Sequence, residues 1–314
     1  MNSFYTIIRS KLWMIVFIVP MASCGSDSSS DWDIESEVVI STDNAIEVTQ
    51  KSLSSAEFAL TSVSAFVELI ESLTVTPGNQ ILGCPGGGTE SIKVDNFHAS
   101  VGITSGTRIT IIDDNCTDIE NTSATNGELE VKVLNTNGNL FDGRITFKGY
   151  SIEYNQMDVE SIVFDGTTQF NKVEYLDRYM IYDDNISPST NILNIITTSN
   201  SSSNTVTLKD HRISRELVSH DGDQYEIEIK AIFTSEEIGG QVKISTPDKL
   251  YGTINSTPIS GSIQILGDSG SNIQLTGIDS TYIEIQVEDE AGSLISMDST
   301  YQWTDVLKGL LWTF

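Results

Sequence analysis

The sequence has 314 residues, enough for one large domain or two ordinary ones, and 39% of them are hydrophobic. It can therefore bury a core, which argues against full-length disorder. Lys and Arg number 17 against 44 Asp and Glu, a formal net charge of −27. This charge excludes a general nucleic-acid-binding protein, because neutralising phosphates needs a basic face. Three Cys and three His in the whole chain are too few for a zinc cluster, a haem site or an iron–sulfur centre, so we expect no metal and no cofactor.

The first residues have the order of an export signal. Arg9 and Lys11 precede an apolar run from Leu12 to Ala22, and a small residue follows the run. A membrane-spanning helix needs about 20 apolar residues, more than this run supplies. We therefore expect a cleaved signal peptide and not a transmembrane anchor.

The residues Met21-Ala22-Ser23-Cys24 resemble the lipobox of bacterial lipoproteins, with Met21 where that family usually has Leu. The resemblance implies that residues 1–23 are removed and that Cys24 carries a diacylglycerol and an acyl chain such as palmitate. Two or more acyl chains anchor a protein stably in a membrane. Gly25 follows, and not the Asp that retains lipoproteins at the inner membrane, which implies the outer membrane of a Gram-negative source. The resemblance leaves open whether the domain faces the periplasm or the exterior. Ordinary cleavage with an unmodified Cys24 is the alternative.

A tether and one helix are predicted next. Residues 24–42 begin with small, polar and acidic side chains, which predict a flexible tether. Residues 43–75 predict an amphipathic helix, with Asp43 as its N-cap and Pro77-Gly78 as its stop. Its apolar residues alternate spacings of three and four and form a stripe wider than a coiled-coil seam. We therefore expect the helix to pack on a sheet of the same chain.

From Ile81 onward the hydrophobic period is two, with many β-branched residues, which predicts strands with one buried face. No second long helical pattern follows. We expect residues 76–314 to form a mainly β domain, an antiparallel, meander-rich sheet or sandwich preceded by the helix. The β domain can consist of two halves that meet near residues 183–204. We favour the alternative that this segment is a hairpin, with its tip in the Ser-rich tract, inside one continuous sheet. Turn signals divide the strands, among them Asn126-Gly127, Asn137-Gly138, Asp142-Gly143, Asp165-Gly166 and Gly239-Gly240.

Cys84 and Cys116 are the two cysteines left after Cys24. Export places them in an oxidising compartment, where two cysteines allow one intrachain pairing. We expect a structural disulfide worth on the order of 3–4 kcal/mol in the chain-entropy model. The run from Gly83 to Thr89 looks like a phosphate loop, but it lacks the Lys and the following helix. We interpret it as a tight turn at the disulfide.

The remaining motifs favour no catalytic residue. The tetrapeptide Gly267-Asp268-Ser269-Gly270 resembles the nucleophile motif of chymotrypsin-like proteases, but Ser271 stands where that family has a second Gly. We interpret it as a hairpin turn. His98, His211 and His220 are expected in solvated loops. The acidic clusters are expected in solvated turns with no calcium site; they are Asp113-Asp114-Asn115 with Asp118, Asp183-Asp184-Asn185 and Glu288-Asp289-Glu290.

The lipobox, the Ser/Asp tether, the helix and Cys84-Pro85-Gly86-Gly87-Gly88 together resemble uncharacterised envelope lipoproteins of Gram-negative bacteria. The resemblance implies a location and no activity. We expect a non-enzymatic, lipid-anchored protein whose β-domain binds or scaffolds an envelope component, an envelope protein or a glycan. One alternative is a hydrolase of envelope or extracellular glycan that uses paired carboxylates. The other is an outer-membrane barrel or barrel-assembly component, indicated by the apolar residues from Leu310 to Phe314.

Overall fold

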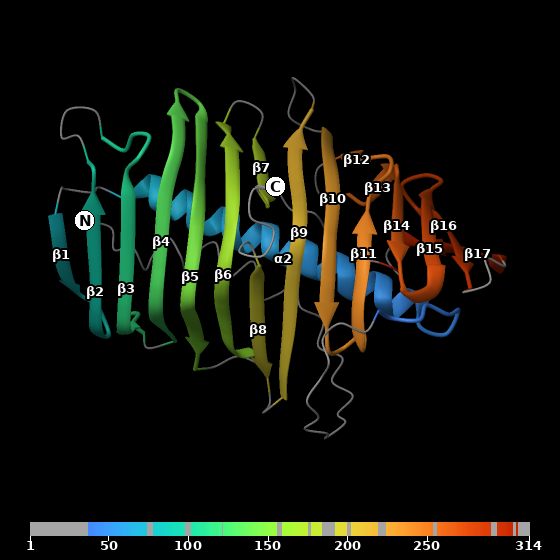
Figure 1. Ribbon diagram of the computed structural model, residues 1–314, viewed down its shortest axis with the longest axis horizontal. Coiled ribbons are helices and arrows are strands. Elements are labelled where there is room, and N and C mark those ends of the chain that lie inside the picture. The colour runs from blue at the N-terminus through green and yellow to red at the C-terminus, as the bar shows by residue number, and fades with distance from the viewer. Residues whose placement is uncertain are drawn as a thin grey trace. The chain divides into compact units, whose positions relative to one another are not determined.

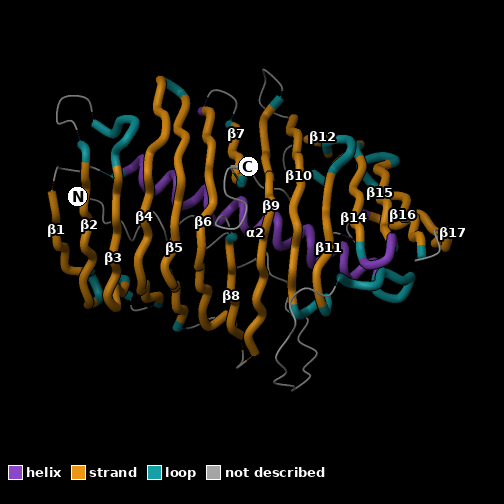
Figure 2. The backbone as a smooth tube through the Cα atoms, in the orientation of Figure 1, coloured by secondary structure: helices purple, strands orange, loops and turns teal. Residues whose placement is uncertain are grey.

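The computed structural model describes residues 37–73, 78–97, 102–120, 122–155, 159–174, 177–183, 192–199, 202–218, 224–253, 256–289, 294–303 and 306. These residues form one long α-helix, α2, and the strands of one 17-stranded, antiparallel sheet (Figures 1 and 2). The expected fold class, a mainly β protein with one N-terminal helix, is confirmed. The signal peptide and Cys24 lie outside the described residues.

The chain divides into two compact units. Unit 1 contains Thr61–Tyr175 and Ile181–Thr207, and unit 2 contains the described residues up to Leu60, Leu176–Met180 and the chain from Leu208. Helix α2 (Ala45–Ser72) contributes to both units, since the division falls between Leu60 and Thr61. Two further changes of unit, between Met180 and Ile181 and between Thr207 and Leu208, fall inside strands.

The strands of unit 1 form a meander in which β1 to β6 each pair antiparallel with the next, and β6 then pairs with β8. Their bounds are β1 Gly78–Gly83, β2 Gly87–Asp95, β3 Arg108–Thr117, β4 Ser123–Asn137, β5 Leu140–Tyr154, β6 Val159–Val173 and β8 Leu193–Ser199. Strands β7 (Arg178–Tyr182) and β9 (Ser202–Leu217) pair with each other and contain residues of both units.

The strands of unit 2 are also antiparallel. Strand β10 pairs with β11 and β12, β11 pairs with β14, and β14 to β17 form a second meander. Their bounds are β10 Gln224–Ser235, β11 Gly240–Ser245, β12 Leu250–Thr253, β13 Pro258–Ser260, β14 Ser262–Leu266, β15 Asn272–Gly277, β16 Tyr282–Glu288 and β17 Leu294–Gln302.

Helix α2 packs on its own sheet, as the width of its apolar stripe predicts. In unit 1 the ring of Phe66 makes edge contacts with Phe147, Tyr150 and Phe164, at centroid distances of 5.2, 5.5 and 5.5 Å. Figure 1 shows this part of α2 behind β4–β6. By length and composition α2 could cross a membrane, but 72% of its most apolar window is buried inside the protein. The apolar side chains of α2 are thus mostly buried in the protein core.

The packed chain begins earlier than the expected end of the tether at residue 42. Val38 is 6% and Ile40 2% exposed. The Val38 amide donates to the Gln241 carbonyl (3.0 Å), and the Val38 carbonyl accepts from Asp268 (2.8 Å). The Ile40 amide donates to Ser271 Oγ (3.1 Å). Residues 37–41 are therefore part of unit 2, because their apolar side chains and amides have partners there.

Some of the expected turns lie inside long strands, two of them beside register shifts whose extra residue is in β5. Gly127 and Gly166 both have a φ of 105° and lie within β4 and β6. A Cβ atom would lie 2.4 Å from the Gly149 carbonyl oxygen at Gly127, and 1.9 Å from that of Ile192 at Gly166. Asp142-Gly143 also lies inside a strand, β5. The pairs Asn137-Gly138 and Gly239-Gly240 do form turns, as expected.

Candidate functional site

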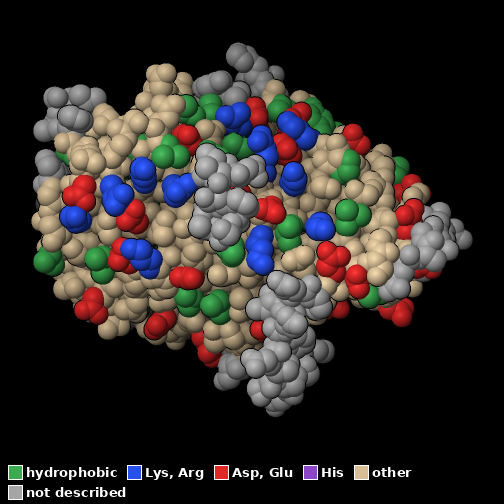
Figure 3. Space-filling model, viewed as in Figure 1, with side chains coloured by type: hydrophobic (Ala, Val, Ile, Leu, Met, Phe, Trp, Pro, Cys, Tyr) green, Lys and Arg blue, Asp and Glu red, His purple; other side chains and the backbone are tan. Residues whose placement is uncertain are grey.

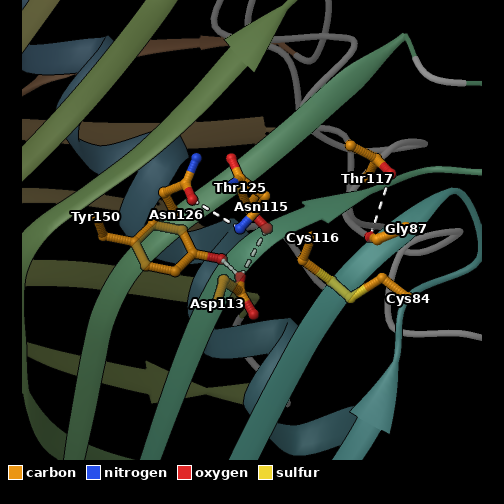
Figure 4. The surroundings of a disulfide bond; sticks show 9 residues. All are labelled: Cys84, Gly87, Asp113, Asn115, Cys116, Thr117, Thr125, Asn126 and Tyr150. Carbon is orange, nitrogen blue, oxygen red and sulfur yellow. Dashed lines mark hydrogen bonds between the residues drawn. A yellow bond between two sulfur atoms is a disulfide. The ribbon is translucent and has the colours of Figure 1, made fainter.

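A disulfide joins Cys84, just after β1, to Cys116 in β3, with their Cα atoms 5.4 Å apart (Figure 4). This confirms the predicted pairing. The Gly-rich run is the expected tight turn, because the Gly87 amide donates to the Cys84 carbonyl and the Cys84 amide to the Gly88 carbonyl, both at 3.2 Å. Gly88 has a φ of 79°, and a Cβ there would lie 1.9 Å from the Asn115 carbonyl oxygen.

A pair of buried carboxyl groups lies beside this disulfide. Asp113 in β3 is directly opposite Glu90 in β2, and they are 4% and 3% exposed. Asp113 Oδ2 accepts hydrogen bonds from Thr125 Oγ1 (2.7 Å) and from Tyr150 Oη (2.8 Å), as Figure 4 shows. Glu90 Oε2 and Asp113 Oδ1 have no hydrogen-bond partner among the described residues.

The surroundings of this acid pair favour its protonated forms. Burial and, as the smaller cause, the neighbouring Asp113 carboxylate together raise the pKa of Glu90 to about 7. Burial also raises the pKa of Asp113, against the hydrogen bonds from Thr125 and Tyr150, which lower it. Both shifts favour the neutral carboxyl groups. The pair is enclosed by the core, so it acts on the stability of unit 1.

The expectation of solvated acidic turns is wrong for two residues of the first acidic cluster, Asp113 and Asp118, whereas Asp114 and Asn115 are exposed. Asp113 lies inside β3, where it continues the buried alternation of Ile109 and Ile111 before the register shift at Asn115. Asp118 is 2% exposed and accepts from the Thr122 amide at 2.7 Å. In the second cluster Asp183 is also buried, at 6% exposed. Asp184, Asn185 and Glu290 lie outside the described residues.

A second buried acid, Glu57 on α2, lies in unit 2 and is 2% exposed. Burial raises its pKa to about 8, although the positive charge of Arg215 lowers it. Burial raises the pKa of Tyr225, as does the nearby Glu57 carboxylate. Tyr225 Oη donates to the Ser256 carbonyl at 2.9 Å, and the Arg215 guanidinium carbon lies 5.8 Å from the centroid of the Tyr179 ring. No local pattern predicts this cluster, since its members are far apart in the chain.

The solvated-loop prediction is also wrong for His211, which lies in β9 and is 1% exposed. The reason is Asp210, whose φ of 45° interrupts the alternation of the strand. Burial moves from the even position Leu208 to the odd positions His211 and Ile213. His98 and His220 lie outside the described residues.

The protease-like tetrapeptide is a hairpin turn, as expected. It joins β14 to β15, which pair antiparallel, and forms a short 3-10 turn from Asp268 to Gly270. Ser269 has a φ of 55°, and its Oγ donates to Asp268 Oδ1 at 3.2 Å. The Ser269 hydroxyl therefore forms a hydrogen bond within the turn.

The long strands of unit 1 have one buried and one exposed face. In β4, Leu129, Val131 and Val133 are at most 1% exposed and alternate with charged residues. On the exposed face Lys148 Nζ lies 2.6 Å from Glu128 Oε1, and Arg108 Nε lies 3.5 Å from Glu130 Oε1. Figure 3 shows Lys and Arg side chains gathered on this face, interleaved with acids.

Among the described residues, no group of three or more His, Cys, Asp and Glu side chains is placed to hold a metal ion. Comparisons with protein-family models, with curated proteins and with solved structures find no match for this chain.

Proposed function

We propose that this chain is a lipid-anchored envelope protein whose β-domain binds an envelope component without catalysing a reaction. The observation that carries the proposal is the two-sided character of β3, β4 and β5. One face of these strands packs in the core, and the other exposes a broad row of charged and polar side chains. A rigid, exposed polar face suits the recognition of a partner.

The N-terminal sequence supports the anchor. The lipobox-like Met21-Ala22-Ser23-Cys24 supplies a cysteine for lipidation, and packing in unit 2 begins near Glu37. The difference, 37 − 24 = 13 residues, allows a reach of at most about 45 Å when extended. The disulfide between Cys84 and Cys116 suits the oxidising compartment to which such a signal leads.

The placement of the paired carboxyl groups favours binding over glycan hydrolysis. A glycosidase needs two carboxyl groups in contact with the sugar, one on each side of the scissile bond. Asp113 and Glu90 are 4% and 3% exposed and face each other inside the core. Tyr150 and Thr125 hold Asp113 there. This geometry makes the acid pair a structural element of unit 1.

The experiment is crosslinking in intact envelopes, followed by purification and identification of the partner. Wild-type protein should fractionate with the outer membrane and yield a reproducible crosslinked component. Cys24→Ala should accumulate as uncleaved precursor without lipid, and Gly25→Asp should move the protein to inner-membrane fractions. Wild-type protein found wholly in the soluble fraction would overturn the anchor. If the purified protein cleaves glycan and the Asp113→Asn variant does not, the function is glycan hydrolysis and not binding.

A further inference from the structure

Strand β1 is an edge strand of the unit 1 sheet. It pairs with β2 along its whole length, in one register that runs from Gly78 opposite Val94 to Gly83 opposite Thr89. Figure 1 shows β1 at the end of the meander, with no described strand beyond it. An edge strand presents backbone amides and carbonyls that can pair with a strand of another chain. A further strand can therefore be added to the sheet at β1.

The hydrogen bonds of the adjoining turn indicate which backbone groups of β1 point away from β2. The Cys84 amide donates to the Gly88 carbonyl at 3.2 Å, so these two opposite residues are a hydrogen-bonded pair. In an antiparallel ladder such pairs alternate with pairs that exchange no hydrogen bond. Counting back from Cys84, the backbone groups of Gly83, Ile81 and Asn79 face the open edge. Each copy of the chain thus presents three amides and three carbonyls to a further strand.

The side chains of β1 are exposed on both faces of the sheet. Ile81 lies opposite Ser91 on the outer face and is 70% exposed. Leu82 lies opposite the buried Glu90, on the core side, yet it is 42% exposed. Soluble proteins usually protect an edge strand with charged residues, a proline or a bulge, and β1 contains none of these. Its backbone edge and its apolar side chains are therefore accessible together.

We propose that β1 pairs antiparallel with β1 of a second copy of this chain, about a two-fold axis at Ile81. Ile81 then lies opposite the partner subunit's Ile81, and Asn79 lies opposite Gly83 of the partner subunit. In this register all six outward-facing amides, three from each copy, donate to a carbonyl of the other copy. The two copies use the same surface, as in most homodimers. The inference goes beyond the proposed function and does not depend on the lipid anchor.

The distribution of charge favours a second copy as the occupant of this edge. Two copies with a net charge of −27 each repel each other over most of their surfaces. Residues 72–89, which include β1, contain no Asp, Glu, Lys or Arg, so two copies can meet there without like charges in direct contact. A basic peptide, which an acidic chain attracts in general, finds no carboxylate on β1 to bind. The uncharged strand therefore suits an uncharged copy of itself.

The disulfide holds this edge in place. Cys84 follows β1 directly and is bonded to Cys116 in β3, with their Cα atoms 5.4 Å apart. Strand β1 is thus fastened past β2 to the next strand of the sheet, which keeps that end of β1 from fraying. An edge that is already ordered loses less entropy on association. Reduction of the disulfide should therefore weaken the dimer.

The test is sedimentation equilibrium of the full-length protein, purified in a density-matched detergent. A contact of one strand per copy is small, so we expect a reversible monomer–dimer equilibrium between about 1 and 100 μM. Ile81→Lys should raise the dimer Kd about 100-fold, because it places two like charges opposite each other across the pair. Ile278→Lys is the matched control, since Ile278 is 52% exposed and lies in unit 2; it should leave Kd within about twofold.

Ile81→Pro separates strand pairing from folding. It removes an amide that faces the open edge, where a proline is tolerated, so unit 1 should melt near the parent's temperature. Kd should rise about tenfold, because two of the six hydrogen bonds between the copies are lost.

Hydrogen exchange identifies the contact. The amides of Asn79, Ile81 and Gly83 should be protected at high protein concentration and exchange freely on dilution. Four results would overturn the inference: a monomer at every concentration, equal weakening of the dimer by Ile81→Lys and Ile278→Lys, a dimer in which these three amides exchange freely, or crosslinking of β1 in intact membranes to a different protein and not to a second copy.

Discussion

Replacing Glu90 by Gln should stabilise unit 1 at pH 8 and change little at pH 4.5. The pKa of Glu90 is about 7 in the fold against an ordinary value of 4.5. Below pH 4.5 the group is protonated in both states, so it adds no electrostatic penalty. Between pH 4.5 and 7 the unfolded chain has released the proton and the fold has not, so stability falls as pH rises. Above pH 7 Glu90 is ionised in both states, and the fold bears the full free-energy cost of its buried charge.

The size of the effect follows from that difference in pKa. Each pKa unit corresponds to about 1.4 kcal/mol, so the ionised Glu90 costs the fold about 3 kcal/mol at most. Asp113, whose pKa burial also raises, adds a penalty of the same sign. The amide of Gln keeps the shape of a neutral Glu90. The variant should therefore gain up to about 3 kcal/mol over the parent at pH 8.

Urea unfolding followed by circular dichroism measures the difference between variant and parent at each pH, and hydrogen exchange of β2 and β3 amides localises it to unit 1. Glu153→Gln, at an exposed carboxylate of β5, is the control and should show the parent's difference between pH 4.5 and 8. A gain from Glu90→Gln that is equal at both pH values, or a loss at pH 8, would refute the argument from burial.

Glu57→Gln should likewise stabilise unit 2 above pH 8, because burial raises the pKa of Glu57 to about 8. Between pH 4.5 and 8 the unfolded chain has lost this proton and the fold keeps it, so stability falls as pH rises; urea midpoints at pH 5 and 9 measure the difference between variant and parent. Phe66→Ala removes a ring that touches three others and should cost about 3–5 kcal/mol in urea unfolding. Reduction of Cys84–Cys116 should lower the melting temperature of unit 1, by loss of on the order of 3–4 kcal/mol, as seen by calorimetry. Gly88→Ala should lower it too, since its Cβ would lie 1.9 Å from a carbonyl oxygen.

Local patterns in the sequence predict the elements of this fold well. The helix expected at 43–75 is observed as Ala45–Ser72, because a long apolar stripe and a Pro-Gly stop are both local signals. The disulfide follows from elimination, since Cys84 and Cys116 are the two cysteines left after the lipobox. The period of two correctly predicts strands over most of the chain.

The same patterns do not predict where an alternation changes phase. Gly127 and Gly166 follow Asn or Asp and look like hairpin turns, yet they lie inside β4 and β6, next to register shifts whose extra residue is in β5. Asp210 changes the phase of β9 and buries His211, whereas Asp113 keeps the buried phase of Ile109 and Ile111 in β3. A polar residue at a buried position carries no hydrophobic signal, so its sequence pattern predicts a place in solvent.

Pairings between residues that are far apart in the chain also cannot be predicted from local sequence patterns. Glu90 and Asp113 become neighbours only when β2 and β3 pair in one register, and a shift by one residue would point one of them to the other face. The placement of Arg108 opposite Lys132 and of Lys132 opposite Arg144 depends on two further registers, β3 with β4 and β4 with β5. No local pattern fixes these registers, because several bulges interrupt the strands.

The mass of the N-terminal peptide of the protein, isolated from its native membranes, tests the lipid anchor most directly. The account predicts that the mature chain begins at Cys24 and carries a diacylglyceryl group with a further acyl chain on its amine. Wild-type protein whose chain begins elsewhere, or whose Cys24 is unmodified, would contradict the anchor and with it the proposed place of the protein in the envelope.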